Sequence, residues 1–279
     1  MKPTFIALLA VLLHFGTGCA TTPRLLPKDI PSLKALAEEG NAEAEFQLAN
    51  KYYNGEGVEI DYAQSFKWAS RSAAQDNPKA KYRLGSLYIQ GRGVPKDEKN
   101  AKALFKESKI GLLNLADRND PQAQACLGVM YYRGVGAEKD DKEAVKWSRK
   151  AVEQNYAGAQ HNLGVMYERG EGVEKDEEEA VKWFRKAAEQ NYAGAQHNLG
   201  VMYATGRGVE KDDKEAFKWI HKAAEQNYAG AHRAQYTLGR MYQNGLGVEK
   251  DYNEAVKWFR KAAEQGHEKA KAALKKLSQ

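Results

Sequence analysis

Apolar residues recur along this chain at spacings of three and four, in pairs of short segments separated by polar connections. In residues 159–169, Ala159, Leu163 and Tyr167 lie four positions apart, so they share one face of a helix. Gly164 beside them leaves room for a neighbouring helix to approach. The next segment carries a second apolar stripe, formed by Ala180, Trp183, Phe184 and Ala187. Helices of roughly a dozen residues are marginal alone in water, so the two must pack on each other and on neighbours.

The ends of these two helices are marked by residues with distinct backbone preferences. Gly170 and Gly172 predict a left-handed cap that ends the first helix. Asp176 predicts the N-cap of the second helix, and Glu179 three residues later suggests a capping box. The second helix is expected to end at Asn191, because asparagine tolerates the left-handed conformation.

This unit recurs six times. A Gly-x-Gly sequence begins at Gly55, Gly91, Gly134, Gly170, Gly206 and Gly245. Residues 144–179 and 180–215 are identical at 29 of 36 positions. A fixed period in this range indicates stacked supersecondary units rather than one globular core. We therefore predict an all-α fold, a right-handed α-solenoid over residues 32–279 with cap helices at 32–39 and 268–277. Its six helix-turn-helix repeats are expected at 42–77, 78–120, 121–156, 157–192, 193–228 and 229–267, followed by a C-terminal cap at 268–279.

Two insertions interrupt the period. Seven extra residues between Leu104 and Ala123 bring in the apolar residues Ile110, Leu112, Leu113 and Leu115. The second helix of that repeat is expected to run on, and its apolar ridge either packs down locally or is a docking element. Three further residues, 232–234, are expected to lengthen the first helix of the last repeat by nearly one turn.

The charge pattern argues against a nucleic-acid partner. The chain has 43 Lys and Arg against 37 Asp and Glu, and its pI is about 9.0. However, the lysines are interleaved with glutamates inside each repeat and are not massed in one run. Solvated helix faces explain this pattern better than a phosphate-binding groove.

Residues 1–18 have the features of a secretory signal peptide. A positively charged start precedes an apolar run over residues 5–15, which is too short to span a bilayer. Cys19 follows small residues and resembles the lipobox of bacterial lipoproteins, although Gly16 stands where that motif usually has leucine. The resemblance implies an acylated Cys19 and an outer-membrane lipoprotein that faces the periplasm or the exterior. The alternative is a soluble periplasmic or secreted protein whose signal peptide is simply removed.

The remaining N-terminal residues and the second cysteine fit this interpretation. Residues 19–31 contain three prolines and are expected to form a tether between the anchor and the folded body. With Cys19 assigned to lipid, Cys126 has no partner for an intramolecular disulfide. Its place beside core positions of a helix predicts a small packed residue.

The repeat pattern resembles a known family. The sequence Ala-x3-Leu-Gly-x2-Tyr-x2-Gly-x-Gly-Val-x2-Asp-x3-Ala-x2-Trp-x3-Ala-Ala is similar to the Sel-one-like repeats, relatives of the tetratricopeptide repeats, over residues 40–279. The resemblance implies a scaffold or adaptor, and similar secreted bacterial proteins are linked to host-cell interaction and envelope processes. A cysteine-rich branch is associated with penicillin binding and β-lactamase activity. This chain lacks the paired cysteines of that branch, so the activity is not transferred.

The face of each first helix opposite its core stripe is the expected binding surface, because in tetratricopeptide-like stacks this face lines the concave groove. A solvent-facing surface without a task should be mostly charged. Aromatic residues, imidazoles and valines are found here instead, which indicates protein recognition. The predicted groove residues are Phe46, Tyr53, Tyr82, Ile89, Tyr132, His161, Val165, His197, Val201, Tyr236 and Arg240. The alternative is that neighbouring repeats half-bury this face and that recent duplication alone explains the shared residues.

No residue pattern indicates catalysis, a cofactor or a bound metal. The Gly-x-Gly pairs are expected to end helices and not to bind nucleotides. His161 and His197 are expected roughly 10 Å apart, a helix-packing distance too long for shared metal coordination.

We therefore predict a non-enzymatic scaffold of the bacterial envelope that binds a peptide or protein in its concave groove and reaches the membrane through a lipid anchor. One alternative is a cell-wall or β-lactam-directed enzyme, suggested by family analogy only, and another is a regulator of a cell-wall enzyme.

Overall fold

The computed structural model describes residues 26–27, 29–226, 228 and 230–277. The predicted signal peptide and the lipidation site Cys19 lie outside the described residues. Within the described part, the chain forms fourteen α-helices and no strand, which confirms the all-α prediction. None of these helices combines the length and the apolar character that crossing a membrane requires.

Each repeat contributes a first and a second helix. The first helices are α2 (Ala42–Asn54), α4 (Pro78–Gln90), α6 (Pro121–Arg133), α8 (Ala157–Arg169), α10 (Ala193–Thr205) and α12 (Ala231–Asn244). The second helices are α3 (Tyr62–Ala74), α5 (Glu98–Asp117), α7 (Asp141–Glu153), α9 (Glu177–Glu189), α11 (Asp213–Glu225) and α13 (Tyr252–Glu264). The cap helices are α1 (Ile30–Glu38) and α14 (Glu268–Leu277).

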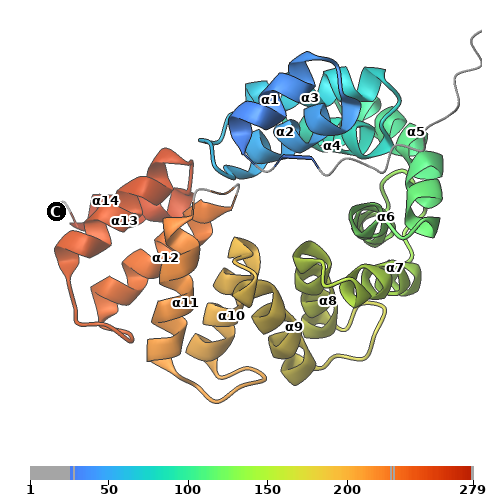
Figure 1. Cartoon of the computed structure of the whole chain (residues 1–279). Helices are drawn as coiled ribbons and strands as arrows, with labels where there is room; N and C mark the ends of the chain where they lie inside the picture. Colours follow the sequence, from blue (N-terminus) through green and yellow to red (C-terminus); the bar gives the residue numbers. More distant parts are fainter. Residues whose placement is uncertain (1–25, 28, 227, 229, 278–279) are drawn as a thin grey trace, which may run out of the picture.

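The helix pairs form a curved solenoid. Every helix packs mainly on the helix before it and the helix after it. Figure 1 shows the first helices on the inner side of the curve and the second helices on the outer side. Weaker contacts between successive first helices, such as α4 and α6, complete the inner wall. The inner wall of this arc is therefore built from the six first helices.

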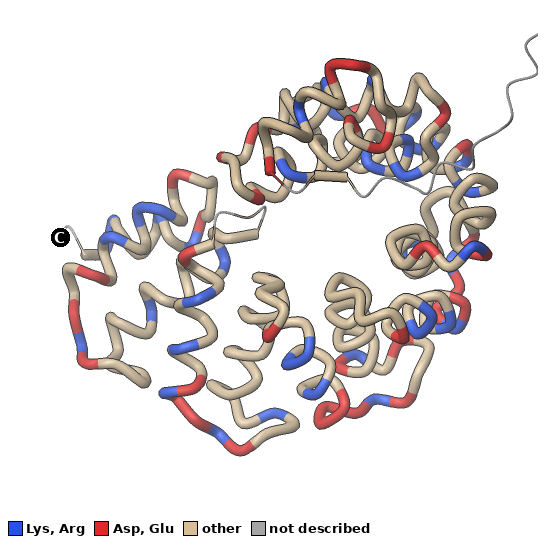
Figure 2. Tube along the Cα trace, in the orientation of Figure 1, with Lys and Arg blue, Asp and Glu red and all other residues tan. Residues whose placement is uncertain are grey.

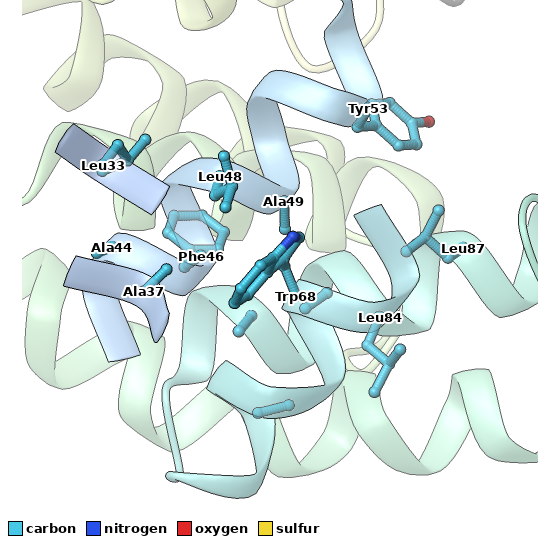
Figure 3. Packing of buried hydrophobic residues seen from close by; sticks show 13 residues of the cluster. Leu33, Ala37, Ala44, Phe46, Leu48, Ala49, Tyr53, Trp68, Leu84 and Leu87 are labelled. Atoms are coloured by element: carbon cyan, nitrogen blue, oxygen red, sulfur yellow. The ribbon is translucent and has the colours of Figure 1, made fainter. Parts of the chain in front are cut away.

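The core is a series of apolar clusters along the solenoid. In the first repeat, Phe46, Leu48 and Trp68 are buried between α1, α2, α3 and α4 (Figure 3). In the fourth repeat the first and second helices also pack closely, with Gly164 of α8 against the Phe184 ring of α9. A Cβ atom on Gly164 would lie 2.7 Å from that ring, so glycine is needed at this contact. The predicted close approach of the two helices is thus confirmed.

A glycine and an aspartate set the end of the first helix and the start of the second helix in each repeat. Gly170 ends α8 in the left-handed conformation, with φ of 71°, and the Asp176 carboxylate accepts from the Glu179 amide at 2.9 Å. Both predicted helix ends are therefore confirmed. The reciprocal half of the capping box is wrong, because the Asp176 N–H donates to the Tyr167 carbonyl at 3.0 Å. The Glu179 carboxylate accepts from Lys182 Nζ instead.

Amide side chains join the two helices of a repeat and also connect neighbouring repeats. Gln190 Nε2 donates to Gln160 Oε1 at 2.7 Å and to Asn155 Oδ1 at 3.1 Å. Asn155 is the left-handed residue that ends the preceding repeat, with φ of 58°. Equivalent Gln-to-Gln bonds occur in the pairs Gln154–Gln124, Gln226–Gln196 and Gln265–Gln235. These Gln-to-Gln bonds lie within a repeat, whereas the bonds from Gln154 to Asn119, from Gln190 to Asn155 and from Gln226 to Asn191 cross to the preceding repeat. This ladder of amides ties the rotation between repeats to a fixed set of hydrogen bonds.

The structure decides between the two alternatives for the seven-residue insertion. Helix α5 runs on for 20 residues, and Leu112 on its added turns is fully buried. A Cβ atom on Gly111 would lie 2.7 Å from Pro78, so this part of α5 rests on the start of α4. Only Ile110, 72% exposed, points away from the body. The ridge therefore packs down locally.

Two other boundaries differ from the sequence prediction. Helix α1 begins at Ile30 and not at Ser32, because Asp29 caps it and Pro31 in its first turn is compatible with a helix start. Helix α12 has 14 residues where the other first helices have 13, so the three-residue insertion lengthens it by only one residue. The other two residues fall in the connection between Glu225 and Ala231.

Candidate protein-binding groove

Two adjoining cavities follow the inner wall of the solenoid. The first has a volume of about 310 Å³, and Tyr82, Arg83, Arg133, Tyr156 and Tyr192 contribute to its lining. The second, of about 390 Å³, is bordered by Val165, His197, Asn198, Tyr228 and Arg233 among others. They share Val129, Arg133 and Asn162. We call the two cavities together the inner groove; its residues come from α2, α4, α6, α8, α10 and α12 and from the connections before α8, α10 and α12.

The structure brings most of the predicted groove residues to this wall. The residues that line the inner groove are Phe46, Tyr53, Tyr82, Tyr132, His161, Val165 and His197. The residues that do not line it are Ile89, Val201, Tyr236 and Arg240. Ile89 borders a separate cavity between α5 and the connection that follows α6.

Burial limits what several of these residues can offer a ligand. Phe46 is only 2% exposed and belongs to the core cluster of the first repeat (Figure 3), so it supports the groove by packing. Tyr53 is 9% exposed, and its ring carries the Arg83 guanidinium at 4.2 Å from the ring centroid. These two residues therefore line the first cavity but expose little surface to a ligand.

One row of the predicted residues packs against the second helices. The Tyr82 ring lies 5.4 Å from Phe105, and His161 lies 5.8 Å from Phe184. Tyr236 lies 5.7 Å from Phe259 and stacks on His267 at 4.5 Å. Each of these three residues is half-buried. Tyr82 and His161 connect the core with the groove wall, and all three residues present only part of their surface to solvent.

The histidines and the cysteine of the groove are uncharged at neutral pH. Burial lowers the pKa of both His161 and His197 to about 4. The Asn198 amide nitrogen lies 3.2 Å from His161 Nε2, so neighbouring repeats are joined at this point. Burial also raises the pKa of the Cys126 thiol to about 12, which keeps the thiol protonated. The described residues contain no group of three or more His, Cys, Asp or Glu side chains that could hold a metal ion.

Three tyrosines that were not predicted from the sequence also line the groove. Tyr156, Tyr192 and Tyr228 stand before α8, α10 and α12 and line the two cavities. A Cβ atom on Gly194 would lie 3.2 Å from the Tyr192 ring, so glycine two residues on leaves the ring its place over the helix start. The recurring sequence Tyr-Ala-Gly-Ala was the signal available for finding them.

Two of these tyrosines occupy positions that elsewhere cap a helix. In the first repeats, Asn41, Asn77 and Asp120 accept hydrogen bonds from the first-turn amides of α2, α4 and α6. Tyr156 and Tyr192 replace them at α8 and α10, and these helices have no side-chain cap. A lost cap typically destabilises a helix by about 1 kcal/mol. Such a departure from a local rule is expected at functional positions.

Charge is distributed unevenly between the groove and the outer surface. Figure 2 shows mixed acidic and basic positions along the connections between first and second helices, for example between α10 and α11. Several basic side chains line the inner groove: Lys79, Arg83, Arg133, Arg169 and Arg233. Among the lining residues of the two cavities the acidic one is Glu168, and it pairs with Arg207 at 2.8 Å.

Comparison with known proteins places the repeats in a family. The model of the Sel1 repeat matches residues 42–77, 78–108, 121–156, 157–192, 193–228 and 232–267. No curated protein matches the chain.

Solved structures resemble the chain over most of its length. One is c5321, described as a protective antigen present in uropathogenic Escherichia coli strains and displaying an SLR fold; it is 37% identical, with a TM-score of 0.54. The match covers 89% of this chain and 51% of that protein, so this chain spans about half the length of that relative. A Sel1 repeat protein from Oxalobacter formigenes is 28% identical, with a TM-score of 0.56 and coverage of 83% and 89%. The immunity protein Pa5087 from Pseudomonas aeruginosa, 21% identical with a TM-score of 0.52, shares the fold over 88% of this chain and 86% of that one.

Proposed function

The chain belongs to the Sel1 repeat family, and from this premise we propose that it is a non-enzymatic binding protein that holds a peptide or protein segment in its inner groove. Sel1 repeat proteins are generally protein-interaction scaffolds. The observation that carries the proposal is the replacement of two helix caps by Tyr156 and Tyr192, whose rings lie in the groove. Local stability is lost there, and aromatic surface is gained where a ligand would lie.

Burial of a few aromatic side chains in the groove could support micromolar affinity for a protein ligand. Burial of one aromatic side chain contributes about 1.5–3 kcal/mol, and a micromolar complex corresponds to about 8 kcal/mol. Rings such as Tyr192, 39% exposed, have surface left to bury. Three or four anchors together with hydrogen bonds to groove amides such as Asn162 would offset the entropy lost on association.

Site-specific photo-crosslinking in cells tests this proposal. A benzophenone amino acid is placed at Tyr192 on the inner wall and, as the matched control, at Lys182 on the outer side, whose side chain is 62% exposed. We expect discrete protein adducts from position 192 and none of the same size from position 182. Equal adducts from both positions, or none from position 192, would contradict a groove-bound protein ligand.

We further propose that the protein is exported and anchored through Cys19. The apolar run over residues 5–15 followed by small residues and a cysteine supports this location. The description of the similar E. coli protein as a protective antigen agrees with exposure outside the cytoplasm. Metabolic labelling with a palmitate analogue should label the wild type and Cys126→Ser but not Cys19→Ser. Equal labelling of the wild type and Cys19→Ser would exclude the anchor.

A further inference from the structure

The charges of the inner groove point to a particular ligand chemistry. Resting on the proposed function, we propose that the groove binds an extended acidic peptide segment, whose carboxylates pair with Arg83, Arg133 and Arg233 while its other side chains pack on the groove tyrosines.

The first observation is the contrast between three groove arginines and the other basic residues. Within the groove itself, Lys79 pairs with Glu43 and Asp120, and Arg169 lies 3.9 Å from Glu171. On the outer surface, lysines pair with glutamates on the same helix, as Lys182 does with Glu179 at 2.9 Å. Arg207 beside the groove pairs with Glu168. In the part of the chain that the structure describes, no carboxylate lies within ion-pair distance of Arg83, Arg133 or Arg233. These cations therefore remain free to bind an acidic group from outside.

The second observation is that Arg83 is held in place by other partners. Its Nε donates to Asn50 Oδ1 at 2.8 Å, and its guanidinium stacks on the Tyr53 ring. Stacking and one hydrogen bond fix the plane of the group while its two terminal nitrogens remain without a carboxylate. A planar guanidinium fixed in this way suits bidentate binding of a carboxylate. Little rotamer entropy is then lost when the ligand binds.

The third observation is the spacing of the wall. Adjacent packed helices lie about 8–10 Å apart, which corresponds to about three residues of an extended peptide at 3.3 Å per residue. Amide side chains that line the same two cavities can pair with the peptide backbone: Gln90, Gln122, Asn162 and Asn198. A single-stranded nucleic acid would instead need cations for successive phosphates along a continuous basic track. Three free guanidiniums distributed over six repeats favour the peptide.

Fluorescence anisotropy with the full chain tests the proposal. The probes are a fluorescein-labelled ten-residue peptide of alternating Glu and Tyr, the same peptide with every Glu replaced by Gln, and a ten-nucleotide oligothymidylate. We expect the Glu peptide to bind at least about tenfold more tightly than the Gln peptide, and this preference to weaken with added salt. The variant Arg83→Gln/Arg133→Gln/Arg233→Gln should lose that preference and keep the affinity for the Gln peptide.

A control variant separates local from overall charge. The control variant also removes three positive charges, but from exposed outer positions: Lys182→Gln/Lys218→Gln/Lys257→Gln. We expect it to bind the Glu peptide like the wild type. If the triple arginine variant is not folded by circular dichroism, Arg133→Gln/Arg233→Gln, at two exposed positions, replaces it. Equal affinity for the Glu and Gln peptides, equal loss in the lysine variant, or tighter binding of the oligonucleotide would overturn the proposal. If position 192 gives protein adducts but the Glu and Gln peptides bind equally, the groove binds a protein without preference for acidic residues. If the Glu peptide binds more tightly but position 192 gives no adducts, the acidic preference holds and the capture of a protein in cells is rejected.

Discussion

One position of the inner helices shows how a single residue type changes the chemistry of the wall. Its occupants in the six repeats are Phe46, Tyr82, Ala125, His161, His197 and Tyr236. Tyr82, His161 and Tyr236 pack on an aromatic ring of the second helix of their own repeat. The histidines differ in that their rings must remain neutral while they are buried there. Protonation of His161 and His197 would place positive charge inside the wall.

The lowered histidine pKa values predict acid-sensitive stability. The pKa of His161 and His197 is about 4 in the folded chain against an ordinary value of 6.5, so the unfolded chain takes up these protons first. Stability from the two neutral rings is therefore complete above pH 6.5 and is lost as the pH falls towards 4. The variant His161→Tyr/His197→Tyr, which copies the residue of the second and sixth repeats, should lose less stability between pH 7 and pH 4.5. We expect a difference on the order of 2 kcal/mol, reduced from the full linkage value because both rings are partly exposed.

Urea unfolding at the two pH values measures this difference. Carboxylates titrate in the same range in both proteins, so the comparison isolates the two histidines. An identical loss of stability in wild type and variant would show that these rings are not held neutral by burial.

The starts of the second helices are alike in all six repeats, whereas the starts of the first helices differ. All six second helices begin at an aspartate whose carboxylate caps the first turn and whose own N–H is taken by a tyrosine carbonyl of the preceding helix. The aspartate and the preceding glycines are visible in the sequence, and so these boundaries could be predicted. The tyrosine carbonyl could not, because a backbone acceptor leaves no mark on residue identity. The starts of α8 and α10 diverge, since a tyrosine there has replaced the capping side chain.

The missing cap can be restored and measured. Tyr192→Asn and Tyr192→Ala both remove the ring from the groove, but only asparagine can accept hydrogen bonds from the first-turn amides of α10. We expect Tyr192→Asn to be more stable than Tyr192→Ala by about 1 kcal/mol, within a range of about 0.5–2 kcal/mol. Thermal unfolding of the two variants checks this value. Equal stability would mean that α10 needs no cap, so Tyr192 at this position would cost no stability and the replaced cap would not support a role in binding.

The whole molecule behaves as a one-dimensional stack. Each helix is stabilised by its two sequence neighbours, and nearly all interhelical contacts join consecutive helices. Helix α8 has a repeat on either side, whereas α14 covers the last cluster from one side only, with Ala270 packed near Phe259 and Ala262. In such arrays the stability of a unit is approximately its own contribution plus those of its nearest interfaces. Local opening should therefore be easiest at the ends.

Hydrogen–deuterium exchange followed by mass spectrometry tests this order. We expect backbone amides of α14 to be protected at least about tenfold less than those of α8, with α12 and α13 between them. The amide ladder should make exchange fall stepwise from repeat to repeat towards the centre. Uniform protection from α2 to α14 would show that the chain opens only as one cooperative body.

The repeat, its two helices and their boundaries could be read from residue order alone, because these depend on local rules: spacing of apolar residues, glycine in left-handed turns, and aspartate at helix starts. The sequence also predicted the face of the first helices on which seven of the eleven expected groove residues line the two cavities, and its role in binding stays a prediction. The folded arrangement was needed to show how far Phe46 is buried, that Leu112 packs against the body, and that Tyr156 and Tyr192 line the groove. Among the described residues, it also placed no carboxylate within ion-pair distance of Arg83, Arg133 or Arg233, because pairing depends on distances between repeats that no local pattern records.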